Sequence, residues 1–269
     1  MTSRMEALPA PSRTRNVRTT NAPGLPAPAG ELAFLLDIDG TLLDIAPTPR
    51  AVLVPASLRQ TLARIGKLSD GALALISGRS LQDIDRIFAP IQLPAIGGHG
   101  AEFRPVKGKA SLRGRATPLS SALRQRLAGI AALGPGIIVE DKGYSLALHY
   151  RQAPKLKRAI ERAVDAVRAE TPGLEALPGK AVIEIKHKGL DKGKAVRRLM
   201  EFAPFAGRRP VFIGDDYTDE SVFAVLPEFN GIGFSVGRKM PGAAGTFETP
   251  RDVRQWLDRI SKPEAAAAP

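Results

Sequence analysis

The chain of 269 residues contains no cysteine and only three histidines. Without cysteine it cannot form disulfide bonds, use a thiolate nucleophile or hold a zinc–sulfur centre. Three histidines are also too few to favour a histidine-rich metal site. Any metal ion should therefore be bound through oxygen ligands. The absence of cysteine fits a reducing compartment, and we expect a cytoplasmic protein.

Long apolar runs are missing as well. No stretch approaches the roughly 20 residues that a membrane-spanning helix needs, and residues 1–30 lack the continuous apolar core of a signal peptide. The apolar runs that do occur have the length of buried strands. We therefore expect a globular protein with no membrane partner.

Tyrosine and tryptophan are scarce, with three and one residues, whereas positive charge is abundant and gives a net charge of +12. A basic chain raises the question of a nucleic-acid partner. Residues 105–186 hold 15 lysines and arginines against 7 acids, and residues 1–30 add four arginines against Glu6. The positive charge thus belongs to one internal segment and one tail. Because few aromatic side chains are present to stack on bases, we expect no nucleic-acid partner.

The hydrophobic pattern alternates between strands and helices from residue 31 onwards. Buried-strand patterns at 31–38, 71–77 and 93–98 alternate with amphipathic helical patterns at 55–69 and 80–89. The alternation resumes with helical patterns at 191–203, 218–228 and 249–261 and strand patterns at 209–216 and 230–236. This order predicts an α/β fold, a Rossmann-like parallel sheet with helices on both faces.

Between these two halves the order of elements changes. Helical patterns at 118–133 and 153–170 each precede two strand patterns, at 136–141 and 144–150 and at 173–178 and 181–187. This αββαββ order predicts an antiparallel sheet with helices on one face. We therefore expect an inserted α+β domain at 105–186 within a core formed by 31–104 and 187–262. The tails at 1–30 and 263–269 have the composition of disordered segments.

Acidic residues follow the predicted strands at the edge where ligands of such sheets bind. Asp37 and Asp39 follow the first strand in "DIDGT", and Asp215 and Asp216 follow a later one in "GDDYTDE". Carboxylates gathered at one edge cannot all stay ionised without a cation, and oxygen ligands favour Mg²⁺. We expect Asp37, Asp39 and Asp215 to hold the ion, Asp39 through its backbone carbonyl. Asp216 and Asp219 would either complete the coordination through water or orient a lysine.

These groups together can carry out phosphoryl transfer. A carboxylate can attack phosphorus and form an aspartyl phosphate, and we assign this role to Asp37. Asp39, two residues on, would protonate the leaving oxygen and later deprotonate the attacking water. Ser77 in "ISGRS" and Lys192 in "GLDKGKAV" would stabilise the charge on the phosphoryl oxygens.

Each motif taken alone also has a structural explanation. "DIDGT" is commonly a turn, "ISGRS" a helix N-cap and "GDDYTDE" a capped helix start. "KGLDKGKAV" is similar to a P-loop, but its glycine spacing is one residue short and neither Ser nor Thr follows Lys194. The four motifs in this order, on alternate strand ends, favour a phosphatase.

The motifs "DIDGTL", "SGR", "DKGKA" and "GDDYTDE" resemble the four signatures of the haloacid-dehalogenase superfamily of aspartate-nucleophile phosphatases. The segments "GALALISGRS", "GGHGAEFR", "SLALHYRQAP" and "GKAVIEIK" resemble the bacterial trehalose-6-phosphate phosphatases, and this likeness extends over residues 31–261. The resemblance implies a Mg²⁺-dependent hydrolase of trehalose biosynthesis whose inserted domain is a cap. Its substrate would be a small sugar phosphate, trehalose 6-phosphate.

In that family the cap binds the distal glucose through a Glu-x-Lys and a Lys-x-x-x-Glu motif. The matching residues in this chain are Glu140, Lys142, Lys180 and Glu184. Charged groups make strong hydrogen bonds to sugar hydroxyls, which suits this role. Without the resemblance, the four residues would be interpreted as solvated charges on strands.

Three more residues are expected beside the substrate: Gly78 and Arg79 in "SGR", and His99 in "GGHGAE". A single histidine is equally often structural. One departure from the family pattern is His187, which stands where bacterial relatives usually have the proline of "EIKP". This substitution lies at the second connection between cap and core and bears on the stiffness of that hinge.

Two alternatives remain open at this stage. A relative with the same type of cap could act on another sugar phosphate, such as sucrose 6-phosphate or a phosphorylated mannosyl compound. A nucleic-acid binder could also have kept an old phosphatase fold, but a complete catalytic set argues against it. We expect a monomer, because no unexplained apolar patch is evident in the sequence.

Overall fold

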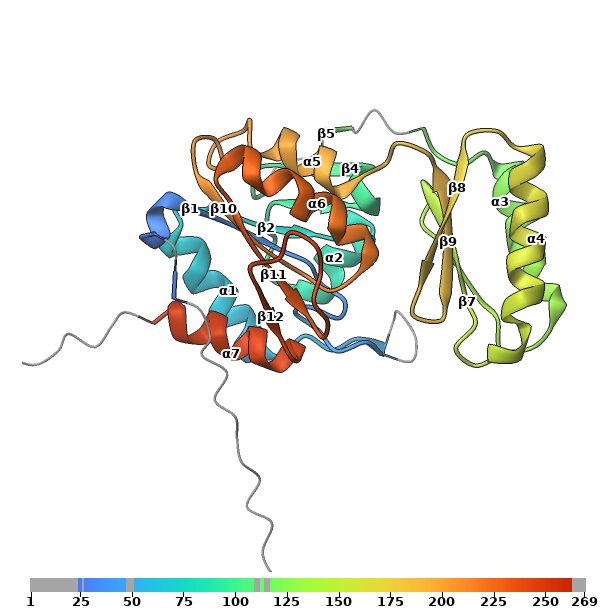
Figure 1. Ribbon diagram of the computed structural model, residues 1–269, viewed down its shortest axis with the longest axis horizontal. Coiled ribbons are helices and arrows are strands. Elements are labelled where there is room, and N and C mark those ends of the chain that lie inside the picture. The colour runs from blue at the N-terminus through green and yellow to red at the C-terminus, as the bar shows by residue number, and fades with distance from the viewer. Residues whose placement is uncertain (1–23, 26, 47–50, 109–111, 114–116, 263–269) are drawn as a thin grey trace, which may run out of the picture.

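The computed structural model describes residues 24–25, 27–46, 51–108, 112–113 and 117–262 (Figure 1). Most of the predicted N-terminal tail and the whole predicted C-terminal tail lie outside these residues. Two β-sheets, each covered by its own helices, lie next to one another in the structure.

The larger sheet has eight strands in the order β12-β11-β10-β1-β2-β3-β4-β5. Its parallel strands are β1 (Leu32–Leu36), β2 (Leu73–Ile76), β3 (Ala95–Gly97), β10 (Arg209–Gly214), β11 (Ile232–Val236) and β12 (Gly245–Phe247). Two antiparallel strands, β4 (Glu102–Arg104) and β5 (Leu112–Arg113), extend one edge. The predicted parallel sheet is thus confirmed. The short strands β4, β5 and β12 were not predicted, because none of them contains a run of apolar residues.

Helices cover both faces of this sheet, and strand β1 shows why. Successive side chains of a strand point to opposite faces. Leu32, Phe34 and Leu36 pack with α1 (Ala56–Leu68), α2 (Leu81–Phe88) and α7 (Pro250–Ile260). Ala33 and Leu35 pack on the other side with α5 (Lys192–Leu199) and α6 (Glu220–Val225). Both faces are therefore apolar, which explains the continuous apolar run at β1.

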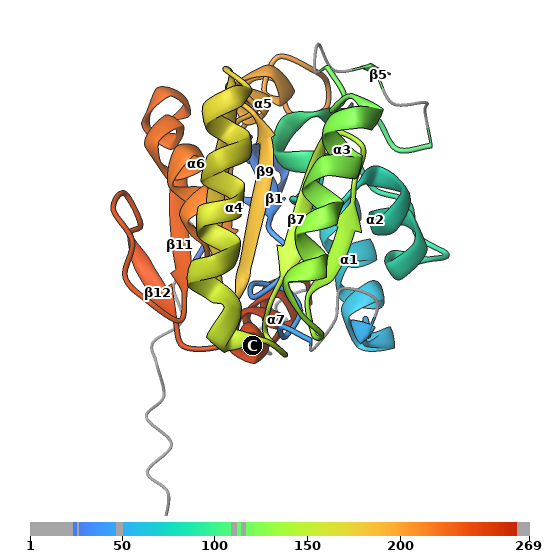
Figure 2. The ribbon, with the colours of Figure 1, turned by 90° about the vertical axis from the view of Figure 1, so that its right-hand side faces the viewer.

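The smaller sheet has four antiparallel strands in the order β6-β7-β9-β8. They are β6 (Ile138–Asp141), β7 (Ser145–His149), β8 (Leu174–Gly179) and β9 (Val182–His187). Helices α3 (Ser121–Ala128) and α4 (Lys157–Glu170) lie side by side on one face, as predicted (Figure 2). The other face is turned towards the larger sheet (Figure 1). Polar side chains on that face are therefore placed opposite the strand ends of the larger sheet.

Some predicted helices are shorter or divided in the structure. The pattern at 118–133 forms α3 and a 3₁₀ segment, Gly129–Leu133, and the pattern at 218–228 is divided between Tyr217–Asp219, α6 and Leu226–Phe229. Strand β5 joins the larger sheet although its residues fall inside the predicted insertion. No helix in the described part of the chain is long and apolar enough to cross a membrane.

Candidate active site

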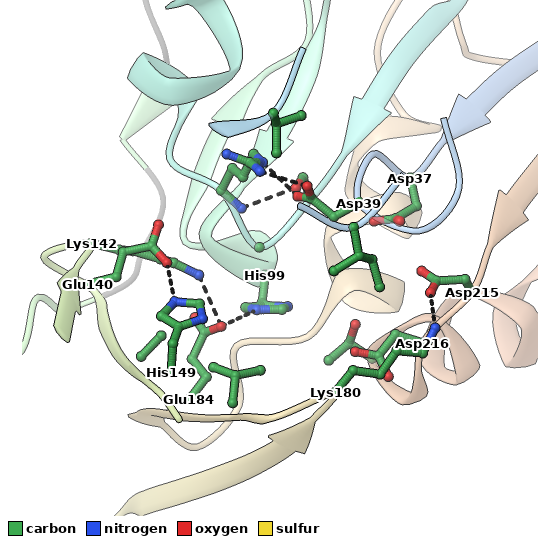
Figure 3. Close-up of a pocket in the computed structure, with 18 of the residues that line it drawn as sticks. Asp37, Asp39, His99, Glu140, Lys142, His149, Lys180, Glu184, Asp215 and Asp216 are labelled. Atoms are coloured by element: carbon green, nitrogen blue, oxygen red, sulfur yellow. Dashed lines mark hydrogen bonds and ion pairs between the residues drawn. The ribbon is translucent and has the colours of Figure 1, made fainter. Parts of the chain in front are cut away.

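One cavity lies between the carboxyl ends of the strands of the larger sheet and the uncovered face of the smaller sheet (Figure 3). It is lined from the larger sheet by Asp37, Asp39, Ser77, Gly78, Arg79, His99, Lys192, Asp215 and Asp216. From the smaller sheet it is lined by Glu140, Lys142, His149, Lys180 and Glu184. Apart from Asp219, which is fully buried, the candidate site residues from the sequence all line this cavity, although they come from both sheets.

Asp37 lies directly after β1 and is buried beside Lys192. Its backbone N–H donates to the carbonyl of Ile213 on β10, at 2.9 Å, which holds the loop against the neighbouring strand. Lys192 is the first residue of α5, and Asp191 caps that helix by accepting from the Lys194 N–H. The ammonium Nζ of Lys192 lies 2.9 Å from Asp37 Oδ1 and 2.8 Å from Asp219 Oδ1. Burial lowers the pKa of Lys192, but the two carboxylates outweigh it and raise that pKa above its ordinary value.

Three buried carboxylates form a group in which a cation could be held. Asp37, Asp215 and Asp219 each offer an oxygen, and these oxygens lie within 4.8 Å of one another. Burial raises the pKa of Asp37 well above its usual value, although Lys192 opposes the change. Burial likewise raises the pKa of Asp215 to about 6, against the effect of a hydrogen bond from Lys180. Crowded oxygen ligands that resist ionisation fit a hard divalent cation such as Mg²⁺.

Asp219 performs a second task in this group. Its Oδ2 accepts the backbone N–H groups of Asp215 and Asp216, at 2.9 Å and 3.0 Å, while its Oδ1 contacts Lys192. It therefore shapes the loop after β10 and orients the lysine, one of the two alternatives considered for it. The carboxylate of Asp216 is not in the group of three, because it caps the following turn by accepting from the Tyr217 N–H.

Asp39 is also outside the group of three, because Arg79 holds its carboxylate. Arg79 Nε donates to Asp39 Oδ2 and Nη2 donates to Oδ1, each at 2.6 Å. Only 6% of the arginine side chain is exposed, whereas 37% of the Asp39 side chain is. The Arg79 backbone N–H donates to Ser77 Oγ at 3.1 Å, so the serine and the arginine are positioned together.

Glycines make the close approaches at this site possible. Gly40, between the two motif acids and the next turn, has φ +85°, and a Cβ there would overlap the carboxylate of Asp215. A Cβ on Gly78 would likewise overlap the ring of His99. Both positions therefore require glycine, one for its backbone conformation and both for space.

His99 connects the larger sheet to the smaller one. It lies just after β3 in a left-handed conformation, with φ 54°. Its Nε2 is 3.1 Å from Glu184 Oε2 on β9. An ionised carboxylate can only accept, so Nε2 carries the hydrogen. Burial lowers the pKa of His99 from its ordinary value of 6.5, although Glu184 opposes this effect.

The four charged residues of the smaller sheet lie in the cavity. Within each motif, however, the glutamate and the lysine do not pair with one another. Glu184 accepts from Lys142 at 3.1 Å and from Ser145 at 2.6 Å. Glu140 pairs instead with His149, at 2.8 Å, and Lys180 with Asp215 of the larger sheet, at 3.0 Å.

The surroundings of Glu184 and Lys142 shift both pKa values in the direction that favours the ionised form. Burial raises the pKa of Glu184, but Lys142, His99 and Ser145 together hold it well below its usual range. Burial lowers the pKa of Lys142, but Glu184 and Glu140 outweigh it and raise that pKa. The Glu184 carboxylate and the Lys142 ammonium are therefore kept ionised although they are buried, so both can hydrogen-bond as charged groups.

The sequence singled out fewer residues than the cavity contains. His149 and Tyr150 are successive residues in the strand pattern at 144–150, so they are expected to point to opposite faces. The structure places Tyr150 in the core under α3 and α4, and His149 in the cavity. Arg151 was missed. Its guanidinium donates to the carbonyls of Ala46 and Lys180, at 3.3 Å and 3.4 Å, and so links the two sheets. The contact of Arg151 with the larger sheet is to the backbone of Ala46, in the loop after β1, so no side-chain pattern in the sequence indicates it.

Comparison with known proteins agrees with this geometry. A family model described as trehalose-phosphatase matches residues 35–249. The chain is 39% identical over 236 residues to the trehalose-6-phosphate phosphatase of Escherichia coli (strain K12), covering 88% of this chain and 89% of that protein. It is 39% identical over 219 residues to a probable trehalose-phosphate phosphatase of Sinorhizobium fredii, covering 81% and 82% of the two chains.

A solved structure shows the same fold. The C-terminal domain of the Candida albicans trehalose-6-phosphate phosphatase superposes with a TM-score of 0.75 and 24% sequence identity, over 86% of this chain and 92% of that chain.

Proposed function

Because this chain belongs to the trehalose-phosphatase family and is a phosphatase, we propose that it hydrolyses trehalose 6-phosphate to trehalose and phosphate through an aspartyl-phosphate intermediate, with Mg²⁺ as cofactor. The observation that carries the proposal is the shared cavity. It joins a buried carboxylate beside a buried lysine to four charged side chains on a second sheet. The first set suits phosphoryl transfer and the second suits the hydroxyl groups of a sugar.

Asp37 is the proposed nucleophile. Lys192 bonds its Oδ1, so Oδ2 is assigned to the attack on phosphorus. A bond forms between Oδ2 and phosphorus while the bond from phosphorus to the sugar oxygen breaks. Water then attacks the phosphorus of the aspartyl phosphate, which releases phosphate and restores the carboxylate. The fixed charge of Lys192 stabilises the negative charge that develops on the phosphoryl oxygens.

Asp39 is the proposed proton donor and acceptor. It gives a proton to the departing sugar oxygen in the first step and takes one from the attacking water in the second. Its exposed position in the cavity suits both exchanges. Arg79 fixes its direction through two hydrogen bonds. Ser77 and the backbone N–H of Gly78 are proposed to donate to the phosphoryl group.

The group of three buried carboxylates, Asp37, Asp215 and Asp219, is the proposed Mg²⁺ site. Asp37 and Asp215 would bind the ion directly, with the backbone carbonyl of Asp39 as a further ligand and Asp216 acting through water. Asp219 supports the site from behind through its bonds to Lys192 and to the backbone. When bound, the ion would supply positive charge against the phosphoryl oxygens and would favour the ionised form of the buried acids.

The smaller sheet is the proposed sugar-binding cap. Glu140, Lys142, Lys180 and Glu184 would hydrogen-bond to the hydroxyl groups of the sugar, because charged groups bind neutral hydroxyls strongly. His99 holds Glu184 in place and is proposed to border the sugar. We keep residues 105–186 as the proposed bounds of this domain, in a monomeric, cytoplasmic enzyme of trehalose biosynthesis.

The test is phosphate release from trehalose 6-phosphate, glucose 6-phosphate and sucrose 6-phosphate, each with and without Mg²⁺. We expect a strong preference for trehalose 6-phosphate, loss of release without the metal, and loss of release in Asp37→Asn. Glu184→Gln should reduce the preference, whereas Glu161→Gln on the exposed side of α4 is the matched control and should not. Equal release from all three substrates would contradict the sugar-binding assignment, and activity in Asp37→Asn would contradict the nucleophile.

A further inference from the structure

Two lysines form ion pairs with the three buried carboxylates, and they differ in how far they are exposed to water. Lys192 is 3% exposed and is held between Asp37 and Asp219. Lys180 points toward Asp215 from across the cavity (Figure 3). Their charged atoms are 3.0 Å apart, yet the Lys180 side chain is 61% exposed while that of Asp215 is only 3% exposed. A buried ammonium with two carboxylate partners is a permanent part of the site. An exposed one with a single carboxylate partner can return to water at little cost.

Lys180 comes from the opposite side of the cavity. Gly179 and Val182 are paired in register, so Lys180 and Ala181 form the two-residue turn between β8 and β9. Ala181 has φ 63°, and the guanidinium of Arg151 donates to the carbonyl of Lys180 at 3.4 Å. From this turn the Lys180 side chain reaches across to Asp215, in the loop after β10.

Asp215 cannot serve both cations well. It belongs to the group of three carboxylates that fits a divalent ion. An ammonium group at 3.0 Å from Oδ2 occupies one of its two oxygens. A divalent ion on the other oxygen would lie only a few ångströms from the ammonium, and like charges repel strongly at that distance.

We propose that Lys180 is a tethered cation that competes with the metal ion for Asp215, so that metal binding releases Lys180 into the cavity. This inference rests on the metal site and the sugar-binding role of Lys180 proposed above. By reciprocity, any ligand that draws Lys180 away from Asp215 strengthens metal binding to the same degree. The contact therefore couples the two ends of the cavity, the phosphoryl end and the sugar end.

The test measures the affinity for Mn²⁺ alone, by the loss of the free-ion electron paramagnetic resonance signal. Lys180→Gln should bind Mn²⁺ about two- to fivefold more tightly than the unchanged protein, the range expected for a partly exposed ion pair. Lys180→Arg keeps the charge and should stay close to the unchanged protein. Lys157→Gln removes one positive charge from the exposed end of α4 and is the matched control. Raised salt should reduce the difference between Lys180→Gln and the unchanged protein.

The outcomes separate this inference from the proposed function. If Asp215→Asn loses Mn²⁺ binding but Lys180→Gln binds no more tightly than the unchanged protein, the competition is refuted and the metal site stands. If Lys157→Gln tightens binding as much as Lys180→Gln does, the effect is one of overall charge and the competition is refuted. If the unchanged protein binds no Mn²⁺, or Asp215→Asn binds it equally well, both the site and the competition are refuted.

Discussion

The guanidinium of Arg79 donates two hydrogen bonds to the carboxylate of Asp39, each 2.6 Å long. The two residues lie in loops that follow neighbouring strands, β1 and β2. The Arg79 side chain is buried, so it is held more firmly than the acid that it orients. A planar group that forms two parallel bonds fixes both the position and the plane of a carboxylate.

Replacing this arginine by lysine tests whether the geometry matters for catalysis. Arg79→Lys keeps the charge but loses the planar fork. Proton transfer by a positioned side chain contributes about 10²- to 10⁴-fold. Because the lysine retains a single hydrogen bond to Asp39, we expect only part of this to be lost and kcat for phosphate release to fall about 10- to 100-fold. KM should change much less. Steady-state kinetics provide the measurement, and Arg86→Lys, at an exposed pair with Asp83, is the control. An unchanged kcat in Arg79→Lys would show that Asp39 does not depend on this contact.

Removing Lys192 should destabilise the protein as well as inactivate it. Lys192→Met leaves Asp37 and Asp219 buried without their common partner. Breaking a buried ion pair from one side costs about 3–5 kcal/mol, and we expect a loss of this size in the free energy of unfolding measured with urea. Lys194→Met, on the exposed side of the same helix, should change it by less than about 0.5 kcal/mol. Equal stability of the two variants would refute the role of Lys192 as a buried counter-charge.

The buried His99 should make the protein less stable in mild acid. Burial lowers the pKa of His99 below 6.5 in the folded state, so below about pH 6.5 this residue binds more protons in the unfolded chain than in the native one. The stabilising contribution is therefore complete above pH 6.5 and is lost as the pH falls from there. The slope is at most ~1.4 kcal/mol per pH unit.

Urea unfolding between pH 5.5 and 7, with a metal chelator present, measures this slope. Asp37 and Asp215 have raised pKa values and act in the opposite sense, so the informative quantity is the difference between variant and unchanged protein. His99→Asn, whose side chain tolerates the left-handed backbone, should lose less stability on acidification. His187→Asn, outside the cavity, should behave as the unchanged protein does. Identical slopes for His99→Asn and the unchanged protein would count against the prediction.

Adding one methyl group at Gly78 should disturb the connection between the two sheets. The new Cβ would overlap His99, which holds Glu184. We expect Gly78→Ala to lower the free energy of unfolding by about 1–3 kcal/mol and to raise KM for the sugar phosphate. Gly129→Ala has open space around its Cβ and should be nearly neutral. Combining Gly78→Ala with His99→Asn should recover part of the lost stability, and no recovery would place the strain elsewhere.

Most of the larger sheet and its helices could be predicted, because each of these elements has a recognisable pattern of apolar residues in its own stretch of sequence. The all-apolar run at β1 indicates a strand that is buried on both faces, and the period of α7 places Val253, Trp256 and Leu257 on one face. The strand β4 could not be found in this way. Its three residues have no apolar pattern of their own, and it exists because β3 offers an edge with which to pair.

The sequence by itself determined which acids, which hydroxyl and which lysine stand at strand ends, because the end of a strand follows from the residues just before it. Only the tertiary structure decided how these groups are paired. Asp219 joins Asp37 and Asp215 in the acidic group, while Asp39 turns to Arg79. Lys180 pairs with Asp215 and not with Glu184, the glutamate of its own motif. Asp39 and Arg79 are 40 positions apart, and Lys180 and Asp215 are 35 positions apart. The first pairing depends on β1 and β2 lying next to one another, and the second depends on how the smaller sheet lies over the larger one. No local pattern encodes either arrangement.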